Sequence, residues 1–258
     1  MTKTILITGA TDGIGLLTAQ LLAEKGHKLL LHGRSAEKLE AAKASVGDGA
    51  GTYLADLSSL DATADLAERV KNDHASLDVL INNAGVLKAP KPMLQNGQDI
   101  RFVVNTLAPY VLTKALLPIM PADGRILNLS SAAQAPVNID ALMGGVVQDD
   151  MTAYAQSKLA ITIWSQVMAA ELGDGPAVIA VNPGSLLASK MVKDGFGIAG
   201  NDLRIGADIL CQLALDEAHA QDSGRYWDND IGQFGPAHAA GDDPAHVAAV
   251  MSTISALV

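Results

Sequence analysis

The sequence predicts an α/β fold in which an open, doubly wound parallel sheet of about seven strands carries helices on both faces. Short apolar runs of strand-forming residues alternate with longer segments of helical periodicity, as expected for strand–helix–strand units. The chain has 258 residues, of which 49% are hydrophobic and 18% charged, so it can bury a large core. Neither an internal repeat nor a low-complexity segment interrupts the alternation, and we expect one domain over residues 1–258.

The expected strands are short apolar runs spread along the whole chain. They cover Thr4–Ile7, Lys28–His32, Gly51–Leu54, Val79–Asn82, Arg125–Leu129, Val178–Asn182 and a late run near Arg225–Trp227. The segments between them repeat apolar residues at helical spacing, which predicts helices over Gly15–Lys25, Ala36–Val46, Leu60–Asp73, Ile100–Ile119 and Thr152–Leu172. Right-handed crossovers between these strands give the doubly wound topology.

Two segments break the alternation, Ala132–Asp150 and Gly184–Asp202. Each follows a strand, and loops that leave the carboxyl ends of strands form the ligand crevice in such sheets. We therefore expect both segments to line a substrate pocket. Because Gly195, Gly197 and Gly200 can act as hinges, we expect the second segment to be a mobile lid. Surface decoration is the alternative for both.

Charge and cysteine content argue against several classes of function. The chain carries 28 acidic and 18 basic side chains, and a net charge of −10 repels nucleic acid and anionic lipid. Cys211 is the single cysteine and the six histidines are scattered, so we expect neither a disulfide nor a metal site. No uninterrupted apolar run approaches the roughly 20 residues of a membrane-spanning helix. We expect a soluble, cytoplasmic protein without a nucleic-acid or membrane partner.

The segment after the first strand joins a glycine-rich turn to the start of a helix. A glycine turn lets the backbone approach a pyrophosphate, and the helix N-terminus supplies free N–H groups and the positive end of its dipole. The spacing is GxxxGxG rather than GxGxxG. This context predicts a dinucleotide site with contacts from Gly9, Thr11, Asp12, Gly13, Ile14 and Gly15.

The end of the second strand bears on the choice of dinucleotide. Gly33 stands where NAD-preferring proteins place an acidic residue, and Arg34 follows it. A guanidinium can bind a 2′-phosphate through two hydrogen bonds, which favours NADP(H), with NAD(H) possible. Two observations leave this open: Arg34 can be an exposed residue before the Ser35 helix cap, and Asp12 would repel the phosphate.

Two further turns follow the third and fourth strands. Asp56, with Leu57 beside it, is placed to accept a hydrogen bond from an adenine amino group. The backbone of Asn83, Ala84 and Gly85 is placed to line the adenosine side of the cleft. Both sets can also be ordinary turn residues.

Tyr154 and Lys158 lie four positions apart on a predicted helix and therefore share one face. A phenol with a pKa of about 10 is a poor acid–base catalyst at neutral pH. A nearby ammonium and a cationic nicotinamide favour the phenolate, and lowering the pKa by about three units requires roughly 4 kcal/mol. The pair follows a strand that ends in Ser130 and Ser131, which strengthens the prediction of a catalytic site.

Taken together, these motifs resemble the short-chain dehydrogenase/reductase family of the shorter, single-domain type, which has a Rossmann-type fold. The matching positions run from the glycine turn through Asn82–Gly85 to Asn182-Pro183-Gly184. The resemblance implies that Pro183 and Gly184 lie beside the nicotinamide. It also implies a catalytic tetrad of Asn105, Ser131, Tyr154 and Lys158.

The resemblance further implies a hydride-transfer mechanism between a carbonyl and an alcohol. Tyr154 would protonate the carbonyl oxygen or deprotonate the alcohol, and Ser131 would hydrogen-bond that oxygen. Lys158 would bind the nicotinamide ribose and lower the pKa of Tyr154, and Asn105 would hold a water of a proton relay. We prefer Ser131 to Ser130 because strand residues alternate between faces and the second serine matches the family pattern.

The connection of 23 positions between Ser131 and Tyr154 is longer than in many members and resembles the retinol-dehydrogenase-like branch. A nucleotide-sensing regulator without catalysis and a family-related lyase are the alternatives. The complete tetrad argues against the regulator, and Lys158 with the full glycine turn argues against the lyase. The substrate is expected to be small to medium and apolar around its carbonyl, given the candidate pocket residues Val86, Leu87, Val137, Leu142, Met143, Met151, Met191 and Phe196. A homodimer or homotetramer is expected through two helices whose apolar residues can alternatively be core, namely Leu107, Val111, Leu112, Trp164, Val167 and Met168.

Overall fold

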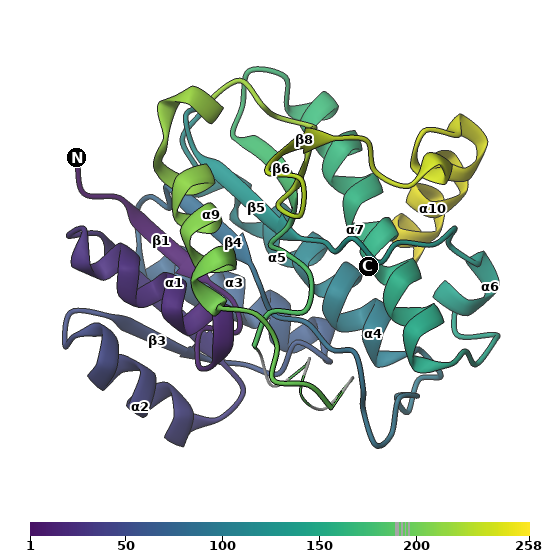
Figure 1. Cartoon of the computed structure of the whole chain (residues 1–258), viewed down its shortest axis with the longest axis horizontal. Helices are drawn as coiled ribbons and strands as arrows, with labels where there is room; N and C mark the ends of the chain where they lie inside the picture. Colours follow the sequence, from purple (N-terminus) through teal and green to yellow (C-terminus); the bar gives the residue numbers. More distant parts are fainter. Residues whose placement is uncertain (189–190, 192, 194, 196) are drawn as a thin grey trace.

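The computed structural model describes residues 1–188, 191, 193, 195 and 197–258. Its strands form one sheet in the order β3-β2-β1-β4-β5-β6-β7-β8 (Figure 1). All neighbours pair in parallel except β7 and β8. The strands are β1 (Thr4–Ile7), β2 (Lys28–Gly33), β3 (Gly51–Leu54), β4 (Val79–Asn82), β5 (Arg125–Leu129), β6 (Ala177–Asn182), β7 (Tyr226–Asp228) and β8 (Gln233–Gly235).

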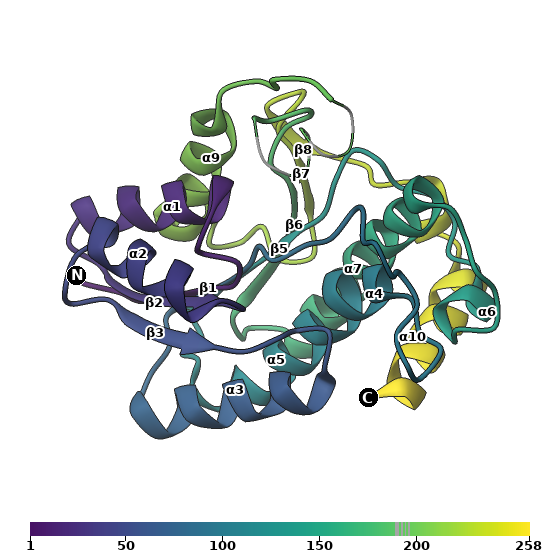
Figure 2. The same ribbon diagram turned by 90° about the horizontal axis from the view of Figure 1, so that it is seen from below.

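Helices cover both faces of the sheet (Figure 2). One core lies beneath α1, α2 and α9, and the other beneath α3, α5, α7 and α10. The helices are α1 (Gly13–Glu24), α2 (Ala36–Val46), α3 (Leu60–Asp73), α4 (Ile100–Phe102), the π-helix η1 (Val103–Leu107), α5 (Ala108–Leu116), the 3-10 helix η2 (Leu117–Ile119), α6 (Ile139–Leu142), α7 (Asp150–Leu172), α9 (Leu203–Leu215), the 3-10 helices η3 (Glu217–His219) and η4 (Ala239–Gly241), and α10 (Pro244–Leu257).

The strand order reverses between β1 and β4, because the chain builds β2 and β3 on one side of β1 and returns to the other. Such a reversal opens a crevice at the carboxyl ends of the two strands, where ligands bind in doubly wound sheets. The predicted fold is therefore confirmed. It also means that the glycine turn after β1 and the Asn83–Gly85 turn after β4 leave the sheet side by side.

Several elements differ from the sequence-based expectation. The expected helix Ile100–Ile119 is divided into α4, η1, α5 and η2, and Ala132–Asp150 contains the short helix α6. The strand β8 and the helices α9 and α10 were not expected. β8 has three residues, none of them buried, and α10 buries only Val250 and Ile254, so neither leaves a strong apolar period in the sequence.

The run Ile100–Ile119 also bears on the membrane expectation. Among the described residues it is the one segment long and apolar enough to cross a membrane, with a mean hydropathy of 1.4, although 67% of the tested window is buried inside the fold. Arg101 and Lys114 interrupt it. Its apolar composition is accounted for by burial between the sheet and neighbouring helices.

The apolar residues considered for an oligomer contact lie mostly in the core of the single chain. Leu107, Leu112 and Trp164 have no exposed surface, and Met168 is also buried. The Trp164 ring packs edge-on against Tyr110, with ring centroids 5.5 Å apart. Core packing therefore explains these four residues, and two partly buried valines, Val111 and Val167, remain for a contact between copies.

Candidate active site

The turn between β1 and α1 depends on glycines in the left-handed region. Gly9 has φ +65° and Gly13 has φ +54°, values that residues other than glycine rarely adopt. Asp12 caps α1, because its Oδ1 accepts a hydrogen bond from the Gly13 N–H at 2.8 Å. The turn thus brings the N-terminus of α1, of which Ile14 is the second residue, to the carboxyl end of β1. Such a terminus suits an anion.

Asn83, in the turn after β4, holds this glycine turn from the other side. Its amide nitrogen donates to the main-chain oxygens of Thr8 at 2.9 Å and Gly9 at 3.0 Å. A Cβ on Gly15 would lie 2.4 Å from that nitrogen, and a Cβ on Gly9 would lie 3.0 Å from the Ala84 Cα. The structure therefore brings these predicted residues together in close backbone contact. The Asn83 side chain stabilises the turn through its two hydrogen bonds to the main chain.

His32 is a residue of this cradle that the sequence analysis missed. It is 3% exposed, and its Nδ1 accepts a hydrogen bond from the Gly9 N–H at 3.2 Å. A main-chain N–H can only donate, so the ring proton lies on Nε2, which donates to the main-chain oxygen of Ala55 at 3.2 Å. Burial lowers the pKa of His32 to about 4. A neutral imidazole thus connects the glycine turn to the end of β3.

The end of β2 lies against the same turn. A Cβ on Gly33 would lie 2.5 Å from the Thr11 Cγ2, so this contact requires glycine. Arg34 follows and is exposed. Lys38, one helical turn further on, has its Nζ 3.6 Å from Asp12 Oδ2, and both side chains are more than half exposed. Lys38 therefore offsets the carboxylate that argued against a phosphate near Arg34.

The turn after β3 fits the alternative reading of ordinary turn residues. Asp56 is exposed, and its Oδ1 accepts a hydrogen bond from the Ser58 N–H at 3.0 Å. Leu57 is buried in the core under α3, so its side chain does not face the cleft. Asp56 still lies at the carboxyl edge of the sheet, where its second oxygen is available to a ligand.

Tyr154 and Lys158 face the end of β5 from the same side of α7. The Lys158 Nζ lies 5.5 Å from the centroid of the Tyr154 ring and donates to the main-chain oxygen of Leu129 at 2.6 Å. Burial lowers the pKa of Lys158 to about 7. Burial raises the pKa of Tyr154, and a hydrogen bond with the Ser131 hydroxyl opposes that rise. The pKa of Tyr154 is raised overall, whereas the sequence analysis expected Lys158 to lower it.

The two serines after β5 have different surroundings. The Ser130 hydroxyl lies in the core, 2.7 Å from the Thr162 hydroxyl and 3.0 Å from the main-chain oxygen of Lys158. The Ser131 hydroxyl acts on Tyr154 and lowers the pKa of its phenol. Ser131 is therefore the serine on the Tyr154 side, as the alternation of faces along a strand predicts.

Two residues absent from the prediction hold the main chain of Ser131. The Tyr226 hydroxyl, from β7, donates to the Ser131 carbonyl oxygen at 3.0 Å, and the Gln134 amide donates to the same oxygen at 2.9 Å. The other end of Gln134 accepts from the His238 N–H at 3.0 Å. The Tyr226–Ser131 and His238–Gln134 contacts join segments about a hundred positions apart, so no local sequence pattern could have indicated these two.

Asn105 lies in the π-helix η1, and both N–H groups of its side-chain amide are engaged. Its Nδ2 donates to the Val86 oxygen and to the Ser157 hydroxyl, both at 2.9 Å, and its Oδ1 accepts from the Val86 N–H at 2.7 Å. The side chain therefore fixes Val86, and its Oδ1 has a second lone pair. A relay water at Asn105 stays a prediction. A π-helical turn is an irregularity frequent at functional sites.

Gly85 marks the point where the predicted site residues meet. A Cβ placed on it would lie 3.5 Å from Asn105 Oδ1 and 3.6 Å from Lys158 Nζ. The same position is 3.6 Å from the Cε of Met191, in the expected lid segment. The described part of that segment also contacts Leu87, whose Cδ2 would be 2.8 Å from a Cβ on Gly195.

The remaining residues expected around the substrate divide into three groups. Val137 and Leu142 are buried and belong to the core on the α7 side of the sheet, and their place in a substrate pocket stays a prediction. Met143 and Met151 are 52% and 40% exposed. Phe196 lies outside the described residues.

The loop after β6 is held by the β7–β8 turn. Gly184 has φ +121°, a conformation that favours glycine. The Asn229 amide donates to the Pro183 oxygen at 3.0 Å, and Asp230 Oδ1 accepts from the Ser185 N–H at 2.7 Å. Pro183 and Gly184 therefore have a fixed backbone at the carboxyl end of the sheet.

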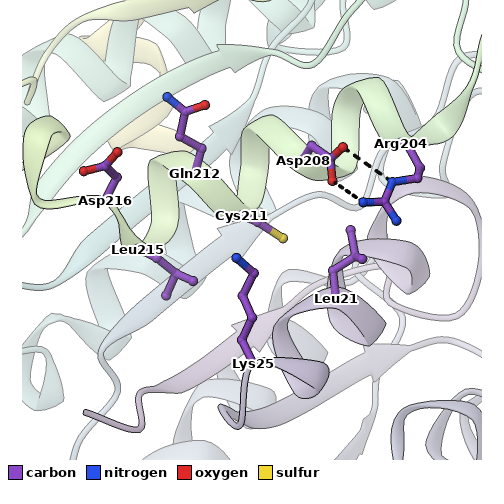
Figure 3. Close-up of a pocket in the computed structure, with 8 residues that line it drawn as sticks. All are labelled: Leu21, Lys25, Arg204, Asp208, Cys211, Gln212, Leu215 and Asp216. Atoms are coloured by element: carbon purple, nitrogen blue, oxygen red, sulfur yellow. Dashed lines mark hydrogen bonds and ion pairs between the residues drawn. The ribbon is translucent and has the colours of Figure 1, made fainter.

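A separate cavity of about 440 Å³ lies between α1 and α9 (Figure 3). The Arg204–Asp208 ion pair lies on its wall, and Lys25 points toward Cys211. Burial raises the pKa of Cys211 to about 11. None of the predicted site residues lines this cavity.

The sequence is similar to a known protein family and to characterised relatives. Residues 3–196 match the short chain dehydrogenase family. Human retinol dehydrogenase 13 is 32% identical over 273 residues, which cover 93% of this chain and 80% of the relative. The bovine dehydrogenase/reductase SDR family member 13 is 32% identical, with 95% of this chain and 70% of the relative covered.

Solved structures give the same result. A short-chain dehydrogenase from Burkholderia cenocepacia in complex with NADP has a TM-score of 0.72 and 27% identity, covering 88% of this chain and 95% of that one. An uncharacterized protein from Mycobacterium paratuberculosis has a TM-score of 0.82 and 26% identity over 99% of this chain and 92% of that one. The family match spans residues 3–196, and human retinol dehydrogenase 13 is 32% identical over 93% of this chain. This protein therefore belongs to the short-chain dehydrogenase/reductase family and is an oxidoreductase of that family.

Proposed function

We propose that this protein is an NADP(H)-dependent oxidoreductase that interconverts a carbonyl and an alcohol, with Tyr154 as general acid and base. The observation that carries the proposal is the grouping of the Tyr154 phenol, the Ser131 hydroxyl and the Lys158 ammonium at the carboxyl end of β5. A phenol and a neighbouring hydroxyl can both donate hydrogen bonds to the carbonyl oxygen of a substrate. Proton transfer from the phenol to that oxygen requires such a hydrogen bond.

The residues of the cleft suit a dinucleotide. The buried Lys158 ammonium has three N–H donors, of which the contact with Leu129 uses one, so it can also bind ribose hydroxyls. The N-terminus of α1 suits a pyrophosphate. When bound, the nicotinamide supplies or accepts the hydride.

The choice of NADP(H) rests on charge at the end of β2. Arg34 is exposed there, and Lys38 lies close enough to Asp12 to offset its charge. A guanidinium binds a phosphate group through charge-assisted hydrogen bonds. Solved relatives from Shigella flexneri, Escherichia coli and Burkholderia cenocepacia are described as complexes with NADP or NADPH. We infer that NAD(H) binds more weakly.

In the reductive direction, Tyr154 gives its proton to the carbonyl oxygen while the Ser131 hydroxyl donates a hydrogen bond to the same oxygen. The opposite direction reverses the proton transfer. Both N–H groups of the Asn105 amide are engaged with Val86 and Ser157, so a relay water at Asn105 would donate to its Oδ1.

The substrate class follows from the apolar residues at the mouth of the site. Met191 lies beside Gly85, and Leu87 lies beside Gly195 of the same segment, so we infer a small to medium substrate that is apolar around its carbonyl. Relatives named retinol dehydrogenase justify including retinoid aldehydes among the compounds tested.

The test is to mix the protein with NADPH and a panel of aliphatic, aromatic and retinoid aldehydes and ketones, and to follow the absorbance of NADPH. We expect turnover with at least one apolar carbonyl compound and slower turnover with NADH. If the protein binds NADPH but oxidises it with no member of the panel, a nucleotide-sensing role without catalysis replaces this proposal.

A further inference from the structure

A buried guanidinium joins the two helices that carry the candidate catalytic residues. Arg101 lies in α4, one helical turn before Asn105, and its side chain has no exposed surface. Its Nε donates to Asp99 Oδ1 at 2.8 Å and its Nη2 to Asp99 Oδ2 at 2.5 Å. Its Nη1 donates to Asp150 Oδ1 at 2.5 Å. One cation is thus shared by two carboxylates.

The second carboxylate belongs to the helix of Tyr154. Asp150 is the first residue of α7 and lies one helical turn before Tyr154. Further along α7, the Ser157 hydroxyl accepts a hydrogen bond from the Asn105 amide at 2.9 Å. The helices α4–η1 and α7 are therefore connected at two levels, by Arg101 with Asp150 and by Asn105 with Ser157. Tyr154 lies between these two connections.

A buried arginine is a directional contact, unlike the apolar side chains around it. Burying a charge is costly unless it is paired and hydrogen-bonded, and Arg101 meets that condition through both carboxylates. Asp99 is itself fixed, because its Oδ1 also accepts from the Arg101 N–H at the start of α4. A charge-assisted pair specifies one geometry, whereas packed apolar residues tolerate small shifts of a helix.

We propose that Arg101, acting through Asp150, is a positioning residue that holds the first turn of α7 so that the Tyr154 hydroxyl meets Ser131. This inference rests on the proposed role of Tyr154. Arg101 makes no contact with the reacting atoms and contributes only by fixing the helix. A misplacement of about 1 Å at a reacting group can reduce turnover by about a hundredfold, so a loosened first turn has a measurable effect.

The test uses Asp150→Asn, which removes the charge and keeps a side chain of the same size. Asp150 is 40% exposed, and Arg101 keeps Asp99 as its neutralising partner, so the variant should fold. We expect kcat to fall between about tenfold and a hundredfold, with the Kd for NADPH unchanged. Asp150→Glu, which restores a carboxylate, should recover part of the loss.

The matched control is Asp149→Asn, at the neighbouring position. Asp149 caps α7 by accepting from the N–H groups of Met151 and Thr152, and asparagine caps helices equally well. This variant should retain the wild-type kcat. A kcat for Asp150→Asn equal to that of the control would overturn the proposal, and so would a parallel loss of NADPH affinity.

A double-variant comparison separates positioning from general damage. In a Tyr154→Phe background, the phenolic hydroxyl that has to be positioned is gone, so adding Asp150→Asn should not reduce the residual single-turnover rate further. An equal fold-loss in both backgrounds would contradict the positioning role. If Tyr154→Phe alone retains wild-type turnover, the proposed function fails instead, and the two failures are thereby distinguished.

Discussion

At the scale of single residues, His32 shows how a buried side chain can fix the geometry of the turn that we propose holds the cofactor. Its two ring nitrogens have different partners, the Gly9 N–H and the Ala55 oxygen, and only the neutral ring satisfies the first. A protonated ring would have to donate toward an N–H group. The cradle therefore depends on His32 staying neutral.

This dependence predicts how stability changes with pH. The pKa of His32 is about 4 in the fold and about 6.5 in an unfolded chain, so the unfolded state binds more protons between these values. The stabilisation is complete above about pH 6.5 and decreases as the pH falls toward 4. We expect this residue to lower the free energy of unfolding by up to about 3 kcal/mol across that window.

Urea unfolding measured between about pH 7.5 and about pH 4 checks this expectation. His32→Gln can accept from Gly9 and donate to Ala55 without titrating, so its stability should depend less on pH than that of the wild type. His27→Gln is the control, because His27 is only partly buried while burial also lowers its pKa. An identical pH dependence for wild type and His32→Gln would show that His32 protonates without cost.

Arg34 gives a second prediction at this scale. Arg34→Ala should reduce the preference for NADPH over NADH about tenfold to a hundredfold, since a charge-assisted bond to phosphate contributes roughly 1.5 to 3 kcal/mol. Lys38→Ala should reduce the preference by a smaller factor, because Asp12 then loses its nearby cation. Fluorescence titrations with both nucleotides measure this, and Lys43→Ala on the same helix is the control. Equal binding of NADH and NADPH by the wild type would contradict the role of Arg34.

At the scale of elements, α5 and α7 form a packed layer under the sheet. Trp164 has no exposed surface and meets Tyr110 edge-on. Trp164→Ala should lower the free energy of unfolding by about 3 to 5 kcal/mol, because it leaves a large cavity. Denaturant titration gives the stability and light scattering gives the mass. A stable variant that changes its oligomeric state would instead place Trp164 at a contact between copies.

The segment after β6 gives the second prediction for an element. The Met191 side chain lies beside Gly85, which is in contact with the site. Met191→Ala should change the ratio of kcat/KM for a bulky and a small ketone by about 1 to 3 kcal/mol, with NADPH affinity maintained. Met143→Ala, at an exposed position after α6, is the control. An unchanged ratio would mean that this segment does not form the substrate wall.

At the scale of the whole molecule, the sheet was predictable and several of its supports were not. The bounds of β1, β3, β4 and β5 agree with the expected ranges. Strands β1, β4 and β5 are almost wholly buried and therefore read as apolar runs, whereas β3 is a partly exposed edge strand. The Tyr154–Lys158 pair was also predictable, since its spacing follows from one helix. His32, Tyr226 and Arg101 were not, because each acts through partners distant in sequence or on another element.

This distribution has a physical reason. The catalytic groups must lie on one face, which leaves a local spacing in the sequence, whereas the groups that hold them only need to be buried and hydrogen-bonded in three dimensions. The same holds for Asn105. Its position was found by resemblance, but the engagement of its amide with Val86 and Ser157 is visible only in the structure.

The proposed function depends on Tyr154 acting as the acid toward the reacting carbonyl. The most direct measurement compares single-turnover oxidation of NADPH by wild type and Tyr154→Phe with the best carbonyl substrate, alongside the Kd for NADPH. We predict a rate lower by about 10²-fold or more, equivalent to about 2.7 kcal/mol, with unchanged stability and Kd, because only the phenolic oxygen is removed. A wild-type rate in the Tyr154→Phe protein would contradict the account.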